Sequence, residues 1–208
     1  MRILVISDIH GRCLERADNI ADEYDMTLIA GDITHFGGYL EARDILSDFI
    51  RGRNVFAVYG NCDHNAVDHY LKEEGISVHN TLREFDGCNI TGFSGAPKSH
   101  FNTPGEFDDE SIGQGIMGWD EGTSIVLTHV PPYGTNLDLI SSGHIGSLSV
   151  REFIEEHQPA LHVCGHVHES RGIDRLGNTI IVNPGPYFQG YYADITIEGE
   201  IVCRIREF

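Results

Sequence analysis

Residues 2–10 of the chain, RILVISDIH, establish a pattern that repeats along the sequence. Four apolar residues in succession predict a short buried strand, and Asp8 and His10 follow its end. Residues two apart in an extended segment point to the same side, so this pair can chelate one ion. Apolar, strand-like runs also precede four further motifs, which are Gly31-Asp32, Gly60-Asn61-Cys62-Asp63, Thr128-His129 and Gly165-His166-Val167-His168.

The apolar runs alternate with amphipathic segments. Strands are predicted at residues 2–7, 26–30, 54–59, 124–128 and 160–164, and helices at residues 14–23, 39–52, 66–75 and 149–158. This alternation predicts parallel β-α-β units with right-handed crossovers, in which ligands bind beyond the carboxyl ends of the strands. All five motifs follow predicted strands, so the topology itself is expected to bring them together.

The last part of the chain has a different pattern. Residues 179–183, 192–197 and 201–205 are strand-like, and Glu198-Gly199-Glu200 predicts a hairpin turn. Antiparallel strands are therefore expected at the edges of the sheet. Residues 101–122 are rich in glycine and acidic residues, which predicts a surface excursion with a helix near residues 109–117.

The polar residues of the five motifs combine imidazole nitrogens with hard oxygen donors, the mixture that divalent first-row metals prefer. The predicted metal ligands are Asp8, His10, Asp32, Asn61, His129, His166 and His168. A carboxylate such as Asp32 can bridge two ions with its two oxygens, and a water shared by the ions becomes a nucleophile near neutral pH. Pairs of metals about 3.5–4 Å apart recur in the hydrolysis of phosphate esters.

The motifs differ in how easily they arise by chance. Random placement of this composition gives roughly 0.9 Asp-x-His pairs, so Asp8-Ile9-His10 alone carries no weight. The same calculation gives roughly 0.08 for Gly-His-x-His and roughly 0.09 for Gly-Asn-x-Asp. Each histidine taken singly is more often a hydrogen-bonded loop or core residue than a ligand. Only the joint occurrence of the motifs in this order predicts a metal site.

Length and composition limit the classes of protein to consider. The 208 residues fit one domain over residues 1–208, and 40% hydrophobic content is ordinary for a globular protein. No run approaches the ~18 apolar residues of a membrane span, and the opening run is too short for a signal peptide. Five scattered cysteines without a Cys-x-x-Cys pair argue against a disulfide framework and favour the reducing cytoplasm.

The charge of the chain favours a small substrate. A net charge of −18, with Lys and Arg scattered along the sequence, opposes non-specific binding to a nucleic-acid backbone. We therefore expect a small phosphate ester as the partner and neither nucleic acid nor a membrane. The sequence leaves open whether the chain forms a homo-oligomer.

The ordered motifs resemble those of the calcineurin-like metallophosphoesterases over essentially the whole chain. Residues 60–63, 128–132, 164–169 and 183–185 are most similar to the archaeal branch of Icc-related phosphoesterases. The resemblance implies a four-layer α-β-β-α sandwich with mixed sheets, and two divalent metal ions, manganese first, with iron, zinc, nickel and cobalt as alternatives. It assigns the first metal to Asp8, His10, Asp32 and His168, and the second to Asp32, Asn61, His129 and His166.

One position departs from the family pattern. Many members have histidine where this chain has Cys62, and that histidine protonates the leaving oxygen or stabilises the transition state. A thiol is a poor proton donor in this role, so another group is needed or the contribution is missing. The candidates are His64 and His144, each with the alternative of an ordinary loop or helix-start histidine. The histidines outside the motifs are interpreted as structural, and they are His35, His69, His79, His100, His157 and His162.

The leading interpretation is a dinuclear-metal phosphoesterase. It would hydrolyse a small phosphodiester or phosphomonoester, with a nucleotide or cyclic nucleotide among the candidates, through attack of a metal-bridging hydroxide in which Asp32 and Asn61 take part. A nuclease of the same superfamily is a second interpretation, weakened by the acidic surface. The third is a protein-binding scaffold, like the retromer subunit that this fold resembles; the seven ligands favour catalysis, and Cys62 keeps the scaffold open.

Overall fold

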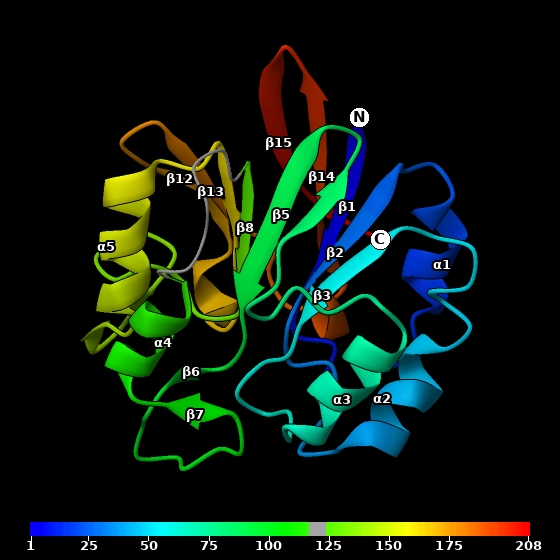
Figure 1. The fold of residues 1–208 in the computed structure, drawn as a ribbon, viewed down its shortest axis with the longest axis horizontal. Coiled ribbons are helices and arrows are strands. Elements are labelled where there is room, and N and C mark those ends of the chain that lie inside the picture. Colours follow the sequence, from blue (N-terminus) through cyan, green and yellow to red (C-terminus); the bar gives the residue numbers. More distant parts are fainter. Residues whose placement is uncertain (117–123) are drawn as a thin grey trace.

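The computed structural model describes residues 1–116 and 124–208. Two sheets pack face to face, with helices on both outer sides (Figure 1). This order of layers confirms the predicted α-β-β-α sandwich. Both sheets combine parallel and antiparallel pairs, because parallel strands from the β-α-β units are extended at the edges by antiparallel strands.

The first sheet has the strand order β15-β14-β1-β2-β3. Its strands are β1 (Arg2–Ile6), β2 (Met26–Ala30), β3 (Val55–Val58), β14 (Tyr191–Glu198) and β15 (Glu200–Glu207). The three N-terminal strands are parallel, and β14 pairs with β1 in the antiparallel direction. The helices α1 (Glu15–Ala21), α2 (Tyr39–Leu46) and α3 (Ala66–Glu73) cover its outer face (Figure 1).

The second sheet has the order β12-β13-β11-β8-β5-β4. Its strands are β4 (Arg83–Phe85), β5 (Cys88–Phe93), β8 (Ile125–Thr128), β11 (Leu161–Val163), β12 (Gly172–Leu176) and β13 (Thr179–Asn183). The helices α4 (Asp109–Ile116) and α5 (Leu148–His157) lie on its outer side. The predicted helix near residues 109–117 is thereby confirmed up to residue 116, whereas residues 117–122 of the predicted excursion lie outside the described residues.

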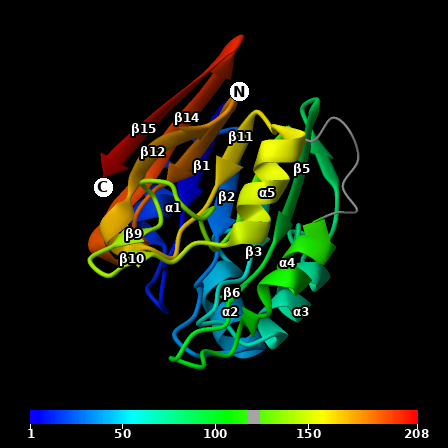
Figure 2. The same ribbon diagram turned by 90° about the vertical axis from the view of Figure 1, so that its left-hand side faces the viewer.

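Short elements lie in the connections between the longer ones. They are the pair β6 (Ala96–Pro97) and β7 (Glu106–Phe107), the pair β9 (Leu139–Ile140) and β10 (Gly143–His144), and the 3₁₀ turns η1 (His168–Ser170) and η2 (Tyr187–Gln189). The turn between β14 and β15 extends at one end of the molecule, next to the start of β1, and β6 and β7 lie at the opposite end (Figures 1 and 2). The carboxyl ends of β1, β2 and β3 therefore point toward β6 and β7.

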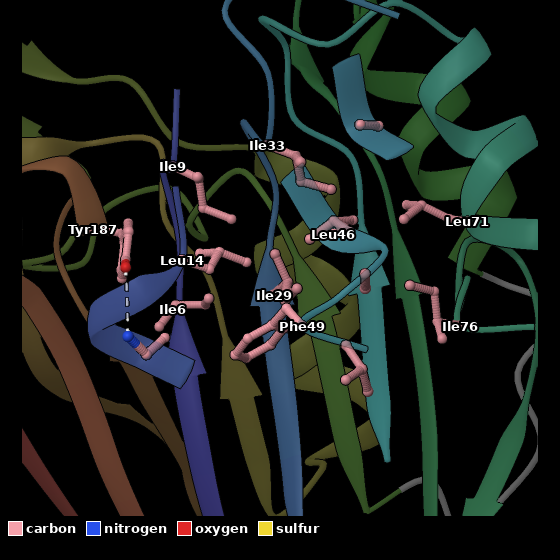
Figure 3. Close-up of a cluster of buried hydrophobic side chains, with 14 of the residues drawn as sticks. Ile6, Ile9, Leu14, Ile29, Ile33, Leu46, Phe49, Leu71, Ile76 and Tyr187 are labelled. Atoms are coloured by element: carbon pink, nitrogen blue, oxygen red, sulfur yellow. Dashed lines mark hydrogen bonds between the residues drawn. The ribbon is translucent and has the colours of Figure 1, made fainter. Parts of the chain in front are cut away.

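The apolar residues of β1 show how the first sheet lies between two other layers. Leu4 and Ile6 face the helices, and Ile3 and Val5 face the second sheet, so both faces of the strand are buried. Figure 3 shows the helix-side core, in which Ile6 and Ile29 lie close to Leu14 and Phe49. A third apolar cluster lies between the second sheet and its helices. Among the described residues, each helix is too short or too polar to cross a bilayer.

Candidate metal centre

The seven predicted ligands meet where five parallel strands end. Asp8 and His10 follow β1, Asp32 follows β2, and Asn61 follows β3 in the first sheet. The second sheet supplies His129 after β8, and His166 and His168 after β11. Both sheets therefore contribute to one cluster at their carboxyl ends, where open α/β sheets bind ligands.

The backbone of this cluster is held in an unusual conformation. Asp8, His10, Asp32 and His166 have φ values of 54°, 48°, 49° and 71°, in the left-handed region that residues with a side chain rarely adopt. Such strain persists only where the surroundings enforce it, and it concentrates at functional sites. Here the backbone N–H groups of Ile9 and His10 both donate to the carbonyl oxygen of Asp32 and join the first two loops.

Asp63 joins the loop after β2 to the loop after β3. Its fully buried carboxylate accepts hydrogen bonds from the backbone N–H groups of Ile33, Thr34 and Gly60, and from the hydroxyl of Thr34. Burial and the nearby charge of Asp32 raise the pKa of Asp63 to about 6. Asp63 thus fixes the spacing between the Asp32 and Asn61 loops without facing the cluster.

Two glycines allow the loops to approach each other closely. A Cβ on Gly60 would lie 2.1 Å from Oδ1 of Asp32, and one on Gly31 would lie 2.6 Å from Nδ1 of His129. Gly31 also has a φ of +90°. A larger residue at either position would displace one of the predicted ligands.

A first group of donor atoms surrounds Asp8. Nε2 of His168 lies 3.1 Å from Oδ1 of Asp8 and 3.4 Å from Nε2 of His10. Nε2 of His10 lies 3.7 Å from Oδ2 of Asp32. The other oxygen of Asp8 accepts a hydrogen bond from the backbone N–H of His166 at 3.2 Å, which fixes the orientation of the carboxylate. These imidazole and carboxylate atoms are close enough to share one cation.

A second group lies on the other side of Asp32. Its Oδ1 lies 3.4 Å from Nε2 of His129, and that nitrogen lies 3.0 Å from Oδ1 of Asn61. The Asn61 oxygen is also 2.8 Å from Nδ1 of His166. The two oxygens of Asp32 therefore face two different donor groups, as a bridging carboxylate would.

The hydrogen bonds of His129 direct one of its ring nitrogens toward the second group. Nδ1 of His129 lies 2.7 Å from the carbonyl oxygen of Ala30, which can only accept, so Nδ1 carries a proton. In the neutral ring the Nε2 lone pair then faces the oxygens of Asp32 and Asn61. Burial opposes a charged ring, but the charges of Asp32 and Asp8 outweigh it and raise the pKa of His129 to about 9. The donors therefore fit a divalent cation, which would replace this proton.

The other pKa shifts follow from burial and from this charge pattern. Burial disfavours the charged form of Asp32, yet His129 lowers the pKa of Asp32 below its ordinary value. Burial also opposes ionisation of Asp8, and the hydrogen bond with His168 lowers the pKa of Asp8. Burial and His129 lower the pKa of His166 to about 4. The two carboxylates are therefore ionised and His166 is neutral at neutral pH, which are the forms that bind metal.

A pocket of about 730 Å³ opens over the cluster. Its lining includes five of the predicted ligands, which are His10, Asp32, Asn61, His166 and His168. Cys62 also lines it, and burial together with the charge of Asp32 raises the pKa of its thiol. This volume lies within the range of small-molecule sites, and the opening gives a ligand access to the cluster.

Sequence comparison identifies the family. Residues 1–170 match the family model described as calcineurin-like phosphoesterase. The chain belongs to the calcineurin-like phosphoesterase family. It is 34% identical over 193 residues to an uncharacterised protein of Methanocaldococcus jannaschii, which covers 89% of this chain and 88% of the relative. It is also 38% identical over 140 residues to the human metallophosphoesterase domain-containing protein 1, across 62% of this chain and 36% of the human protein.

Solved structures share the calcineurin-like phosphoesterase fold. The crystal structure of TT1561 from Thermus thermophilus superposes with a TM-score of 0.77 at 19% identity, over 99% of this chain and 98% of that one. A dimetal phosphatase from Danio rerio superposes with a TM-score of 0.66 at 11% identity, over 100% of this chain and 96% of the other. At these identities the likeness establishes the fold alone, and it agrees with the sandwich described above.

The remaining histidines are placed differently from the seven predicted ligands. His64 is exposed at the start of the α3 region, and Nδ1 of His144 lies 2.7 Å from Oδ1 of the buried Asp138. Within the described part of the chain, neither is among the residues that line the pocket. His100, for which the sequence predicts a structural role, does line it. An isolated histidine between Ser99 and Phe101 carries no motif, so only the folded loop reveals its position.

Proposed function

We propose that this calcineurin-like phosphoesterase hydrolyses a small phosphate ester with the help of two divalent metal ions. The observation that carries the proposal is the placement of Asp32, whose two oxygens face two separate groups of imidazole and oxygen donors. Asp8, His10, Asp32 and His168 would hold one ion. Asp32 would also hold the other, together with Asn61, His129 and His166. Manganese is the first choice, followed by iron, zinc, nickel and cobalt.

When bound, such an ion pair neutralises phosphate charge and lowers the pKa of water enough to give a nucleophile at neutral pH. The residues of the chain have distinct parts in this scheme. The Ala30 carbonyl keeps the proton of His129 on Nδ1 and leaves Nε2 free to bind. Asp63 holds the loops of Asp32 and Asn61 at their spacing. Cys62 lines the pocket with a neutral thiol and is a poor donor of a proton to the leaving group.

We further propose that residues 1–208 form one domain and act in the cytoplasm. The domain assignment is supported by the first sheet, in which β1 from the start of the chain pairs with β14 from near its end. The compartment is supported by the five cysteines, all of which are free. Finding the protein in an oxidising compartment with its cysteines joined in disulfides would contradict the assignment to the cytoplasm.

The test combines metal analysis with a substrate screen. Protein stripped with a chelator is titrated with manganese, and the bound metal per chain is measured together with hydrolysis of an aryl phosphomonoester and an aryl phosphodiester. We expect two ions per chain at saturation and turnover that rises with occupancy. Binding of metal without any turnover would favour the protein-binding scaffold. Hydrolysis of DNA but of neither aryl ester would favour the nuclease.

A further inference from the structure

The pocket over the metal centre has an apolar side that the metal ligands do not explain. This side is lined by Phe36, Phe101, Ile140 and Ile145, whereas the floor of the pocket consists of the polar histidine and carboxylate ligands. Phe36 is 48% exposed, Phe101 is 74% exposed and Ile145 is 40% exposed. Large apolar side chains that gather around one opening are costly to leave in water, and such clusters mark binding sites.

The first ring is held in place by its backbone. Phe36 has a φ of 62°, an outlier for a bulky residue, and its N–H donates to the carbonyl oxygen of Cys62 at 3.0 Å. Thr34, two residues earlier, donates its backbone N–H and its hydroxyl to Asp63, and its hydroxyl oxygen accepts from the N–H of Gly37. This strained conformation is therefore enforced by the same loops that position Asp32 and Asn61, and it keeps an exposed ring at the pocket.

The second ring is carried by a loop closed on one carboxylate. Glu106 accepts hydrogen bonds from the backbone and hydroxyl groups of Ser99, at 3.0 and 2.6 Å, and of Thr103, at 3.1 and 2.8 Å. Although burial opposes ionisation, these hydrogen bonds lower the pKa of Glu106 to about 2. The N–H of Phe101 donates to Oγ of Ser99 at 3.1 Å. The loop is thus ordered by polar contacts while its large apolar side chain stays exposed.

The charged residues of the pocket wall, Lys98 and Glu106, are both held by contacts within the protein. Lys98 also lines the pocket, but its Nζ forms an ion pair with Asp108 at 2.9 Å. His100 packs its ring against that of Phe101, with the ring centroids 4.0 Å apart. The wall therefore presents a largely apolar surface directly beside a floor suited to a phosphate group.

We propose that Phe36, Phe101 and Ile145 form a subsite for the organic group of the ester, and that this group is a flat aromatic ring system, either aryl or nucleobase. The inference rests on the proposed function, because the phosphate is taken to bind at the floor of the same pocket. In an ester the organic group is attached to the phosphate. When the phosphate lies at the floor of the pocket, the organic group therefore extends into the space beside these side chains. A flat ring removes both phenyl rings from water, whereas a short polar alcohol leaves them exposed.

The subsite can be tested by binding alone, without turnover. In phenylphosphonate and methylphosphonate the organic group is joined to phosphorus by a carbon–phosphorus bond, which is not hydrolysed as an ester is. The two compounds differ in this group, which is a phenyl ring in one and a methyl group in the other. With manganese-loaded protein, calorimetry should give a Kd for phenylphosphonate that is roughly tenfold or more below that for methylphosphonate. In the Phe36→Ala/Phe101→Ala double variant, this ratio should fall below about threefold, with the Kd of methylphosphonate unchanged.

Two matched variants control for general effects. Leu82 is 46% exposed and does not line the pocket, so Leu82→Ala should keep the full ratio. Phe101→Tyr retains the ring and should keep it as well. Equal affinity of the wild-type protein for both phosphonates would overturn the subsite and leave the phosphate site standing. Failure of both phosphonates to bind metal-loaded protein would overturn the phosphate site and, with it, the subsite.

Discussion

Thr103 holds the side chain of Asn61 through one hydrogen bond, in which Nδ2 of Asn61 donates to Oγ1 of Thr103 at 2.9 Å. The hydroxyl proton of Thr103 is directed to Oε1 of Glu106 at 2.8 Å, so the hydroxyl oxygen accepts from the amide. This chain of bonds fixes the amide so that its oxygen, and not its nitrogen, faces His129 and His166. The pocket loop therefore contacts Asn61 through the side chain of Thr103, in addition to the hydrogen bond from the N–H of Gly105 to the Asn61 carbonyl oxygen.

The first prediction concerns Thr103→Val, which keeps the shape of the side chain and removes its hydroxyl. The amide of Asn61 would then lose the contact that orients it, and manganese affinity should fall about 10- to 100-fold, as for other residues that orient a ligand. Calorimetric titration of chelator-treated protein measures this. Thr103→Ser should retain the affinity, and Ser99→Ala, which weakens the same loop without contacting Asn61, should change it far less. Unchanged affinity in Thr103→Val would contradict the coupling.

The second prediction concerns Asp32→Asn. The side-chain amide has one oxygen and no charge, so it cannot bind an ion in each of the two donor groups. Turnover should therefore fall on the order of a thousandfold or more. Metal analysis of the same protein should show fewer than two ions per chain. Asp44→Asn is the control, because that exposed carboxylate pairs with Arg43 away from the site and should leave both readouts intact. Turnover retained with manganese would contradict the bridging assignment.

The third prediction concerns the leaving group and Cys62. Because the neutral thiol is a poor proton donor, rates should fall steeply as the pKa of the leaving alcohol rises. Cys62→His should flatten this dependence and accelerate esters of poor leaving groups by about 10²–10⁴-fold, while Cys62→Ala should keep the steep dependence. Rates over a series of aryl and alkyl esters measure both slopes. A shallow wild-type slope that is the same in Cys62→His would show that another group already supplies the proton.

Much of the architecture is predictable because its strands carry strong local patterns. The prediction for residues 26–30 coincides with β2, and the hairpin turn at residues 198–200 is confirmed. The strand β5 was not predicted, since Asn89 and Gly92 interrupt its apolar run. Gly92 is nevertheless required there, because a Cβ would lie 2.3 Å from the carbonyl oxygen of Leu127. That requirement comes from packing against another part of the chain, which a local pattern does not contain.

The candidate site shows the same difference between features set by a local pattern and features set by contacts between distant residues. The seven predicted ligands follow recognisable strands, so topology alone predicts their proximity, and the structure brings them together. The pocket wall is different. The position of His100 and Phe101 depends on Glu106 closing a loop over Ser99 and Thr103, and these bonds form only in the fold. The available signal was an apolar Phe101 among polar residues, which also describes an ordinary exposed loop.

The fourth prediction concerns Asp63→Ala. Removal of its carboxylate leaves three backbone N–H groups and one hydroxyl without their acceptor in a buried place, so the free energy of unfolding should fall by about 2–4 kcal/mol. Urea denaturation of chelator-treated protein measures this without a contribution from bound metal. Asp48→Ala is the control, since its exposed ion pair with Arg51 should contribute less than about 0.5 kcal/mol. Equal effects of the two substitutions would contradict the role given to Asp63.

The last prediction concerns pH and follows from His129. Its pKa of about 9 in the metal-free protein lies above the ordinary value of 6.5, so the folded state binds this proton more tightly than the unfolded state. The resulting stability of the metal-free protein is fully present below about pH 6.5 and is lost as the pH rises through about 9. A metal must displace the same proton. Protonation therefore opposes metal binding at a higher pH than it would at a histidine of ordinary pKa. At His166, whose pKa is about 4, a proton competes with the metal only in more acidic solution.

Manganese affinity should therefore rise by about tenfold per pH unit between roughly pH 7 and 9 and then level off. Binding at pH 7.5 should release about one proton per second-site ion, which calorimetry in buffers of different ionisation enthalpy detects. His69→Gln is the control, because this exposed histidine on α3 should leave the slope unchanged. The stability of metal-free protein should move in the opposite direction over the same interval. Affinity that is independent of pH between 7 and 9 would mean that Nε2 of His129 holds no proton for the metal to displace.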